Sequence, residues 1–327
     1  MSILRASIDK SSLAAFLVAA LSLPCAAQEY PTKPVRMVVP FPPGAGTDIL
    51  ARAIGQKLTE SWGQTVIVDN RPGAGGTIGS EFVAKAPRDG YTLLMGNVST
   101  LAMGPAIYRN IGYDSLKDFA PVSLVSSSEN VIVVHPSLPA NTVKELIALA
   151  RARPKQLLYS SAGSGTTTHL AGELFKMMAK VDIVHVPYKG SPQSIIDLVA
   201  GQVHMSFTSL AAGVPQIKSG RLRAIATTGL KRNPLLANLP TVDESGLKGF
   251  EVNAWQGILA PAGTPAAIVV KLNDGIVRAL ENSEVKERLG SIGLVAAGST
   301  PERFAEYLRS ESIKWAGVVK AAGIRPD

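Results

Sequence analysis

Cysteine is almost absent from this sequence, because the only one among 327 residues is Cys25. Residues 1–27 have the three parts of an export signal: the basic Arg5 and Lys10, an apolar run over 13–23, and small residues before Gln28. We predict a signal peptide over 1–27. The mature chain then has no cysteine, which excludes disulfides, thiolate catalysis and cysteine metal ligands there.

Long apolar runs are also lacking. The run over 13–23 is shorter than the roughly 20 residues of a membrane-spanning helix, and no later segment is long and apolar enough. A lipoprotein acylated at Cys25 is disfavoured, because Ser22-Leu23-Pro24 lacks the usual small residue next to the cysteine. The sequence therefore predicts an exported, periplasmic protein.

Histidine is scarce, and its spacing argues against metal or acid-base chemistry. The four histidines, at positions 135, 169, 185 and 204, form no i, i+4 pair and no H-E-x-x-H motif, so we expect neither a zinc site nor a cofactor. His169 lies within a predicted helix, where it could cap, pack or reach a cleft. Ser164 lies between two glycines, but Ala162 and Thr166 occupy the glycine positions of a hydrolase elbow. A serine hydrolase remains the weaker alternative.

Charge is the next constraint. Removal of residues 1–27, with Arg5, Lys10 and Asp9, leaves 31 basic and 24 acidic residues of the original 33 and 25, a formal charge of +7. This excess suits small anionic ligands, although a solvated basic surface explains it equally well. The basic residues are scattered and lack interleaved aromatics, which disfavours nucleic acid as a partner.

A Gly-x-Gly-Thr loop between an apolar strand and a helix occurs twice, at Gly44–Thr47 and at Gly163–Thr166. Glycine lets the backbone approach a ligand, and a helix N-terminus offers unpaired N–H groups, so each loop could bind an anion. A dinucleotide fingerprint is excluded because the third glycine is missing, and no P-loop occurs. Two such loops suggest a ligand with two anionic ends.

A third glycine-rich loop spans 70–79 and follows the next strand, so it would lie beside the first. Gly73–Gly76 could equally form a simple tight turn. Asp48, in the first helical turn, could stabilise the helix dipole or touch a ligand. Tyr188 and Lys189 could contact a ligand or serve only as turn and surface residues. Trp255 fits the core better than a ligand contact.

Short apolar runs alternate with helical stretches, which predicts an α/β fold with parallel or mixed sheets covered by helices. About 300 mature residues suggest two lobes. Breaks at the serine-rich stretch 119–128 and after Ala226 place lobe 1 at 28–125 and 230–327, and lobe 2 at 126–229. Strands are expected at 35–39, 65–68, 92–95, 131–134, 157–159, 183–186, 204–207 and 223–226. Helices are expected at 47–59, 77–86, 143–152, 167–178, 194–200, 211–219, 265–282, 283–289 and 301–321.

Separated motifs along the mature chain resemble one family, the solute receptors of tripartite tricarboxylate transporters (the Bug or TctC family). They are P-F-P-P-G-A-G-T-D-I-L-A-R (40–52), N-R-P-G-A-G-G-T-I-G (70–79), D-G-Y-T-L-L (89–94), V-P-Y-K-G (186–190), L-P-T-V-D-E-S-G (239–246), W-Q-G (255–257) and P-A-G-T-P (261–265). The resemblance implies a two-lobed, type II periplasmic binding protein. Such a receptor closes on a small carboxylate and presents it to a membrane permease.

The resemblance also implies a set of ligand-binding residues. In lobe 1 they are Phe41, Gly44, Gly46, Thr47, Gly76, Thr77 and Asn97, and in lobe 2 they are Ser161, Gly163, Thr166, Thr167, Tyr188 and Thr208. Many family members carry an acidic residue where this chain has Thr208. An uncharged residue there favours dicarboxylates or aromatic acids over amino acids.

The expected partners are therefore a small di-, tri- or aromatic carboxylate and a permease, with the receptor itself a monomer. A sensory receptor that signals to a membrane partner would have the same motifs and stays an alternative. We expect Thr47→Ala and Thr166→Ala each to weaken ligand binding without unfolding the protein.

Overall fold

The computed structural model describes residues 30–108 and 110–323, so the predicted signal peptide lies outside the described residues. Residues from Lys33 onward form one compact unit, to which the description below refers. Within the described ranges, none of the helices combines the length and the hydropathy that crossing a membrane would require.

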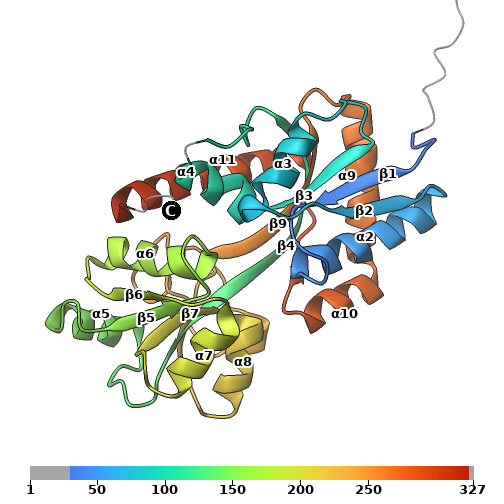
Figure 1. Ribbon diagram of the computed structural model, residues 1–327. Coiled ribbons are helices and arrows are strands. Elements are labelled where there is room, and N and C mark those ends of the chain that lie inside the picture. The colour runs from blue at the N-terminus through green and yellow to red at the C-terminus, as the bar shows by residue number, and fades with distance from the viewer. Residues whose placement is uncertain (1–29, 109, 324–327) are drawn as a thin grey trace, which may run out of the picture. The chain divides into compact units, whose positions relative to one another are not determined.

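The sheet confirms the predicted α/β class (Figure 1). Its principal strand order is β2-β1-β3-β9-β4-β7-β5-β6, with β8 and β10 also paired to β4. Pairing is parallel for β1 with β2 and β3, and for β5 with β6 and β7; β4 and β9 run antiparallel to their neighbours. The strands are β1 (Val35–Val39), β2 (Val66–Asn70), β3 (Thr92–Asn97), β4 (Phe119–Val134), β5 (Leu158–Ser161), β6 (Val184–Pro187), β7 (Met205–Ser209), β8 (Arg223–Thr227), β9 (Asn253–Pro261) and β10 (Val295–Ala296).

Apart from α4, which was not predicted, the helices begin and end close to the predicted positions. Several have side-chain caps at their first turn, such as Thr142 before α5 and Thr300 before α11. They are α2 (Gly46–Trp62), α3 (Thr77–Ala84), α4 (Gly104–Ile107), α5 (Val143–Ala152), α6 (Thr167–Ala179), α7 (Ser191–Val199), α8 (Leu210–Lys218), α9 (Ala266–Glu281), α10 (Ser283–Ser291) and α11 (Pro301–Ala322). Single helical turns occur at Ala74–Gly76, Ser99–Met103 and Pro234–Leu236.

The long strand β4 corrects one sequence interpretation. The serine-rich stretch 119–128, predicted as a break where the chain crosses from one series of strands to the next, is itself strand and continues into the predicted strand at 131–134. Residues 119–129 of β4 pair with β9, and residues 130–134 pair with β7 and β8. The chain therefore crosses between the two groups of strands along a strand, and Figure 1 shows β4 and β9 running between them.

Alternation along β4 separates two hydrophobic clusters, as expected for a strand covered on both faces. Ile132 and Val134 belong to the large cluster, which includes Tyr159, Phe175 and residues of α11. Val131 and Val133 belong to a smaller cluster with apolar residues of α7 and α8. Trp255 is fully buried in the large cluster, which confirms its assignment to the core.

Candidate ligand-binding site

The first glycine loop connects β1 to α2, and among the described residues two of its backbone donors have no acceptor. Gly44, at φ +81°, donates its N–H to Asp48 Oδ2 at 2.9 Å. In the part of the chain that the structure describes, a Cβ added at Gly44 or Gly46 would meet nothing within 4 Å, so the loop borders open space there. Ala45 donates to Pro42 O, whereas the N–H groups of Gly46 and Thr47 have no acceptor within the described chain. These two donors open α2, where an anion is favoured.

Asp48 links this loop to the neighbouring strand. The residue is 2 % exposed, and its carboxylate binds Arg52 at 3.0 and 3.1 Å and accepts from Asn70 Nδ2 at 2.9 Å. Burial alone would raise the pKa of Asp48, but hydrogen bonds from Arg52, Gly44 and Asn70 hold it below its usual value. Asp48 therefore ties the Gly44 loop to Arg52 and Asn70, a structural role that the sequence analysis did not name.

The third loop lies beside the first, as predicted. Asn70 Nδ2 donates to Phe41 O at 3.0 Å, and a Cβ at Gly76 would lie 3.3 Å from the Phe41 ring and 2.6 Å from Thr100 Cγ2. Thr100 in turn donates its N–H to Asn97 Oδ1 at 3.0 Å. The structure thus gathers the predicted lobe 1 residues at the ends of β1, β2 and β3. Gly76 is the N-cap of α3, and Thr77 begins that helix.

The second glycine loop connects β5 to α6, and most of its backbone donors are already used. Ala162 N–H donates to Thr168 Oγ1, Gly163 N–H to Ser161 Oγ and Gly165 N–H to His169 Nδ1, at 2.9 to 3.1 Å. In the described part of the chain, three N–H groups of this loop and its helix start have no acceptor: those of Ser164, Thr167 and Thr168. The sequence had singled out Thr167 but not the other two backbone donors.

Thr166 is the N-cap of α6. Its Oγ1 donates to Gly163 O at 2.6 Å and accepts from His169 N–H at 3.4 Å. Ser161 is fully buried, and its hydroxyl lies 2.6 Å from His185 Nε2. Both side chains are thus engaged in the loop itself, and direct ligand contact by either stays a prediction.

Tyr188 lies next to this loop, and Thr208 lies on the neighbouring strand β7. Tyr188 N–H donates to Ser161 O at 3.2 Å, but its hydroxyl donates to Asp197 Oδ2 at 2.8 Å. Thr208 is 2 % exposed, and its Oγ1 is without a partner in the described structure. It lies on β7 two residues beyond Ser206, which pairs with Ser160 of β5.

Two residues that sequence reasoning missed connect the glycine loops. A Cβ at Gly165 would lie 3.5 Å from Ile107 Cδ1, and one at Gly75 would lie 3.4 Å from the Tyr108 hydroxyl. The end of α4 therefore contacts both the second and the third loop. Neither residue is part of a motif, so nothing in the sequence marked them.

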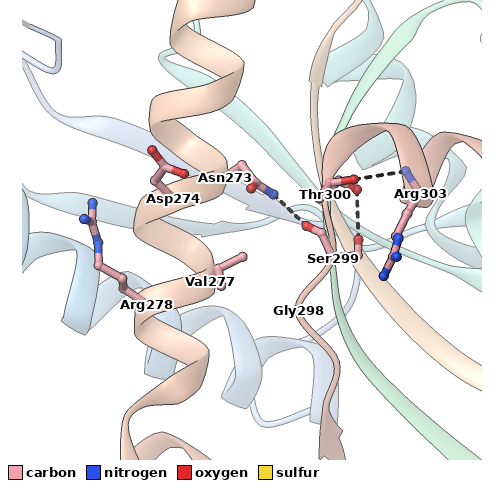
Figure 2. Close-up of a pocket in the computed structure, with 8 residues that line it drawn as sticks. All are labelled: Asn273, Asp274, Val277, Arg278, Gly298, Ser299, Thr300 and Arg303. Carbon is pink, nitrogen blue, oxygen red and sulfur yellow. Dashed lines mark hydrogen bonds between the residues drawn. The ribbon is translucent and has the colours of Figure 1, made fainter.

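A separate groove of about 530 Å³ lies between α9 and residues 298–303 (Figure 2). Asn273 spans it, donating to Ser299 O at 2.7 Å. None of the predicted ligand residues lines this groove. The described residues also include no group of three His, Cys, Asp or Glu side chains that could hold a metal ion.

The hydrolase alternative finds no support in the geometry. Ser164 Oγ makes no hydrogen bond to a histidine within the described residues; His169 accepts from Gly165 N–H, and His185 pairs with Ser161 Oγ. The Ser161–His185 pair resembles a catalytic dyad, but Ser161 is fully buried, and burial lowers the pKa of His185 to about 3. Such an imidazole is a poor base near neutral pH.

Comparison with known proteins identifies the family of this chain. The family model described as tripartite tricarboxylate transporter family receptor matches residues 50–324. A UPF0065 protein encoded in the tcbD-tcbE intergenic region of Pseudomonas sp. (strain P51) is 43% identical over 287 residues, covering 88% of this chain and 85% of the relative.

Solved structures show the same fold. R. palustris Rpa4515 with adipate is 41% identical, with a TM-score of 0.74, and covers 91% of this chain and 100% of its own. MatC from Rhodopseudomonas palustris with bound malate is 33% identical, with a TM-score of 0.70, and the match covers 89% of this chain and 100% of MatC. The chain belongs to the tripartite tricarboxylate transporter receptor family, whose members are solute-binding proteins and not enzymes.

Proposed function

We propose that this chain is exported to the periplasm, loses residues 1–27, and captures a small carboxylate for delivery to a membrane permease. The observation that carries the proposal is the pair of glycine loops. Each combines a helix N-terminus with backbone N–H groups that have no acceptor among residues 30–108 and 110–323, at Gly46 and Thr47 in the first loop and at Thr167 and Thr168 in the second. Such donors bind carboxylates without a paired arginine or lysine.

We assign the two loops to opposite lobes of a cleft, with lobe 1 at 28–125 and 230–327 and lobe 2 at 126–229. The contacts of Ile107 with Gly165 and of Tyr108 with Gly75 support a site that both lobes border. A ligand that bridges both loops would favour closure, because closure requires tighter binding to the closed form than to the open one.

We infer a plain di- or tricarboxylate or an aromatic acid rather than an amino acid as the ligand. Thr208 carries no charge to pair with an ammonium group, and its buried hydroxyl has no partner within the described residues. Relatives whose structures contain adipate and malate are consistent with this class.

Isothermal titration of residues 28–327 with adipate, malate, citrate, benzoate, aspartate and glutamate tests the ligand class. The protein is first unfolded and refolded to remove any ligand retained from the host. We expect saturable one-to-one binding of at least one acid without an ammonium group. Binding of aspartate or glutamate alone would contradict the ligand class, and no binding across the panel would contradict the proposed function.

Delivery to a permease has a separate test. Vesicles that contain the permease of the cognate transporter should take up the identified acid only when the receptor is added. Uptake at the same rate without the receptor would contradict the delivery role while leaving carboxylate binding intact.

A further inference from the structure

Two histidine rings are stacked next to the second glycine loop. His169, in the first turn of α6, is 7 % exposed, and its ring centroid lies 3.9 Å from that of His185 on β6, with 15° between the planes. His185 also stacks on Tyr159 at 4.9 Å. Three rings from three different elements therefore support this loop.

Each imidazole helps to satisfy one glycine N–H of the loop, His169 directly and His185 through Ser161. His169 Nδ1 accepts from Gly165 N–H at 3.1 Å, so this nitrogen carries no proton and the ring proton lies on Nε2. His185 acts through Ser161, whose Oγ lies 2.6 Å from His185 Nε2 and accepts from Gly163 N–H at 3.1 Å. The loop conformation thus depends on the His169 tautomer.

The charged and titratable groups around the rings are Tyr159, Glu173 and Lys176. Glu173 Oε1 lies 4.0 Å from His169 Nε2 and also accepts from the Tyr159 hydroxyl at 2.7 Å and from Lys176 Nζ at 3.0 Å. Burial lowers the pKa of both histidines, in His169 despite the opposing effect of the Glu173 carboxylate and in His185 with further lowering by His169 and Lys176. Both rings are therefore neutral near pH 7, as the bond from Gly165 requires.

We propose that His169 and His185 are positioning residues for the ligand carboxylate, an inference that rests on the proposed function. His169 accepts directly from Gly165 N–H, and His185 holds the Ser161 hydroxyl that accepts from Gly163 N–H, so the two rings orient the loop. The three N–H groups left free, those of Ser164, Thr167 and Thr168, then bind one carboxylate of the ligand. Ser164 thereby joins the predicted site through its backbone and not its hydroxyl.

A positioning role for the histidines and simple charge attraction predict opposite effects of pH on ligand binding. A protonated imidazole would attract a carboxylate, which would strengthen binding as the pH falls. Protonation of His169 Nδ1, however, places a proton opposite Gly165 N–H and removes the acceptor. If the rings act by positioning, binding weakens at acid pH.

Paired substitutions of His169 test the role of its acceptor. His169→Asn keeps an acceptor near the Nδ1 position, whereas His169→Phe keeps a ring for the stack and removes the acceptor. Titration with adipate and malate at pH 7.5 should show about tenfold weaker binding for His169→Phe and at least partial recovery for His169→Asn. Equal affinity of His169→Phe and wild type would overturn the proposal.

His204→Phe provides a matched control. His204 Nδ1 accepts from Leu158 N–H at 3.0 Å, so the substitution removes the same kind of bond from the opposite end of β5. We expect this variant to bind like wild type. A loss equal to that of His169→Phe would show that any damage to β5 weakens binding, which would overturn the assigned role.

Two further measurements use the folded wild-type protein. Between pH 7.5 and 4.5, wild-type affinity should fall relative to that of His169→Asn, because the lowered pKa of His169 places its protonation below pH 6.5. The comparison cancels titration of the probe, and an unchanged or rising relative affinity would overturn the proposal. Long-range ¹H–¹⁵N spectra should show the Nε2–H tautomer for His169, and an Nδ1–H tautomer would overturn it without any ligand. If no acid binds wild type, the proposed function fails, while the spectra still decide the histidine role.

Discussion

At the scale of single residues, Thr166 has a structural role beside its predicted contact with the ligand. Its hydroxyl caps α6 by accepting from His169 N–H. Loss of such a cap costs about 1 kcal/mol, so Thr166→Ala should lower the free energy of unfolding by about that amount as well as weakening binding. Urea denaturation measures the first effect and titration calorimetry the second.

Thr166→Ser retains the capping oxygen and is the control for this prediction. It should unfold at nearly the wild-type urea concentration. Wild-type stability in Thr166→Ala would contradict the capping role, and wild-type affinity in both Thr166→Ala and Thr47→Ala would argue against the two-loop site.

His185 provides a second prediction at this scale, concerning stability and pH. Its pKa is about 3 in the folded protein, against an ordinary value of 6.5, because the ring is buried beside His169. The unfolded chain therefore binds a proton that the folded protein does not. The contribution of this histidine to stability is complete above pH 6.5 and declines as the pH falls toward 3.

His185→Phe removes this titration, so its free energy of unfolding should fall less steeply than that of wild type between pH 6.5 and 4. Urea denaturation at several pH values gives both curves, and at pH 8 their difference reports only packing and the lost bond to Ser161. If the free energies of unfolding of His185→Phe and wild type fell in parallel between pH 6.5 and 4, the low pKa of His185 would be contradicted.

At the scale of elements, helices were predicted better than strands for physical reasons. The helix at 143–152 was predicted with its exact bounds and α11 to within one residue, because capping threonines and proline mark their first turns. The strand β9 was not predicted, and 119–128 was read as a break, because Gly257, Pro121 and the serines weaken the strand pattern locally. Pairing between distant segments stabilises these strands, and local sequence does not encode it.

Prediction of the candidate site is limited in the same way, because local sequence marks its loops but not its long-range contacts. The glycine loops were predictable because φ > 0 and helix starts leave local signatures, as at Gly44 and Gly163. The contacts of Ile107 and the stacking of His169 on His185 join residues far apart in the chain. Only tertiary packing places them beside the loops.

Close packing of α6 against β5 gives a prediction at the element scale. A Cβ added at Gly172 would lie 2.2 Å from the Tyr159 ring, so Gly172→Ala must displace either the helix or the ring. Overpacking of this kind costs about 1–3 kcal/mol. Because α6 carries His169 and the free N–H groups, carboxylate affinity should fall together with stability.

Gly317→Ala is the matched control, since this helical glycine of α11 has nothing within 4 Å of the added Cβ. Alanine in a helix interior is favoured over glycine by about 0.5–1 kcal/mol, so this variant should unfold at a higher temperature and bind normally. Thermal melts measure the stability of both variants, and titrations measure their carboxylate affinity. An unchanged melting temperature in Gly172→Ala would contradict the close packing.

At the scale of the whole molecule, one hydrophobic cluster joins both groups of strands. It includes Val38 and Leu94 of β1 and β3, Tyr159 and Phe207 of β5 and β7, and Trp315 of α11. The proposed lobes therefore share a core although each has its own strands. A shared core makes it costly to unfold one lobe while the other stays folded.

We therefore predict a single calorimetric unfolding transition for residues 28–327, with a van't Hoff enthalpy equal to the calorimetric one, about 200 kcal/mol near 60 °C. A bound carboxylate at 100 times its dissociation constant adds about 2.7 kcal/mol and should raise the midpoint by about 4 °C without splitting the peak. The ligand contacts would lie in both lobes, so both should be stabilised together. Stabilisation of one lobe alone would instead appear as two unfolding peaks that move apart. That outcome would contradict both the shared core and a ligand held between the lobes.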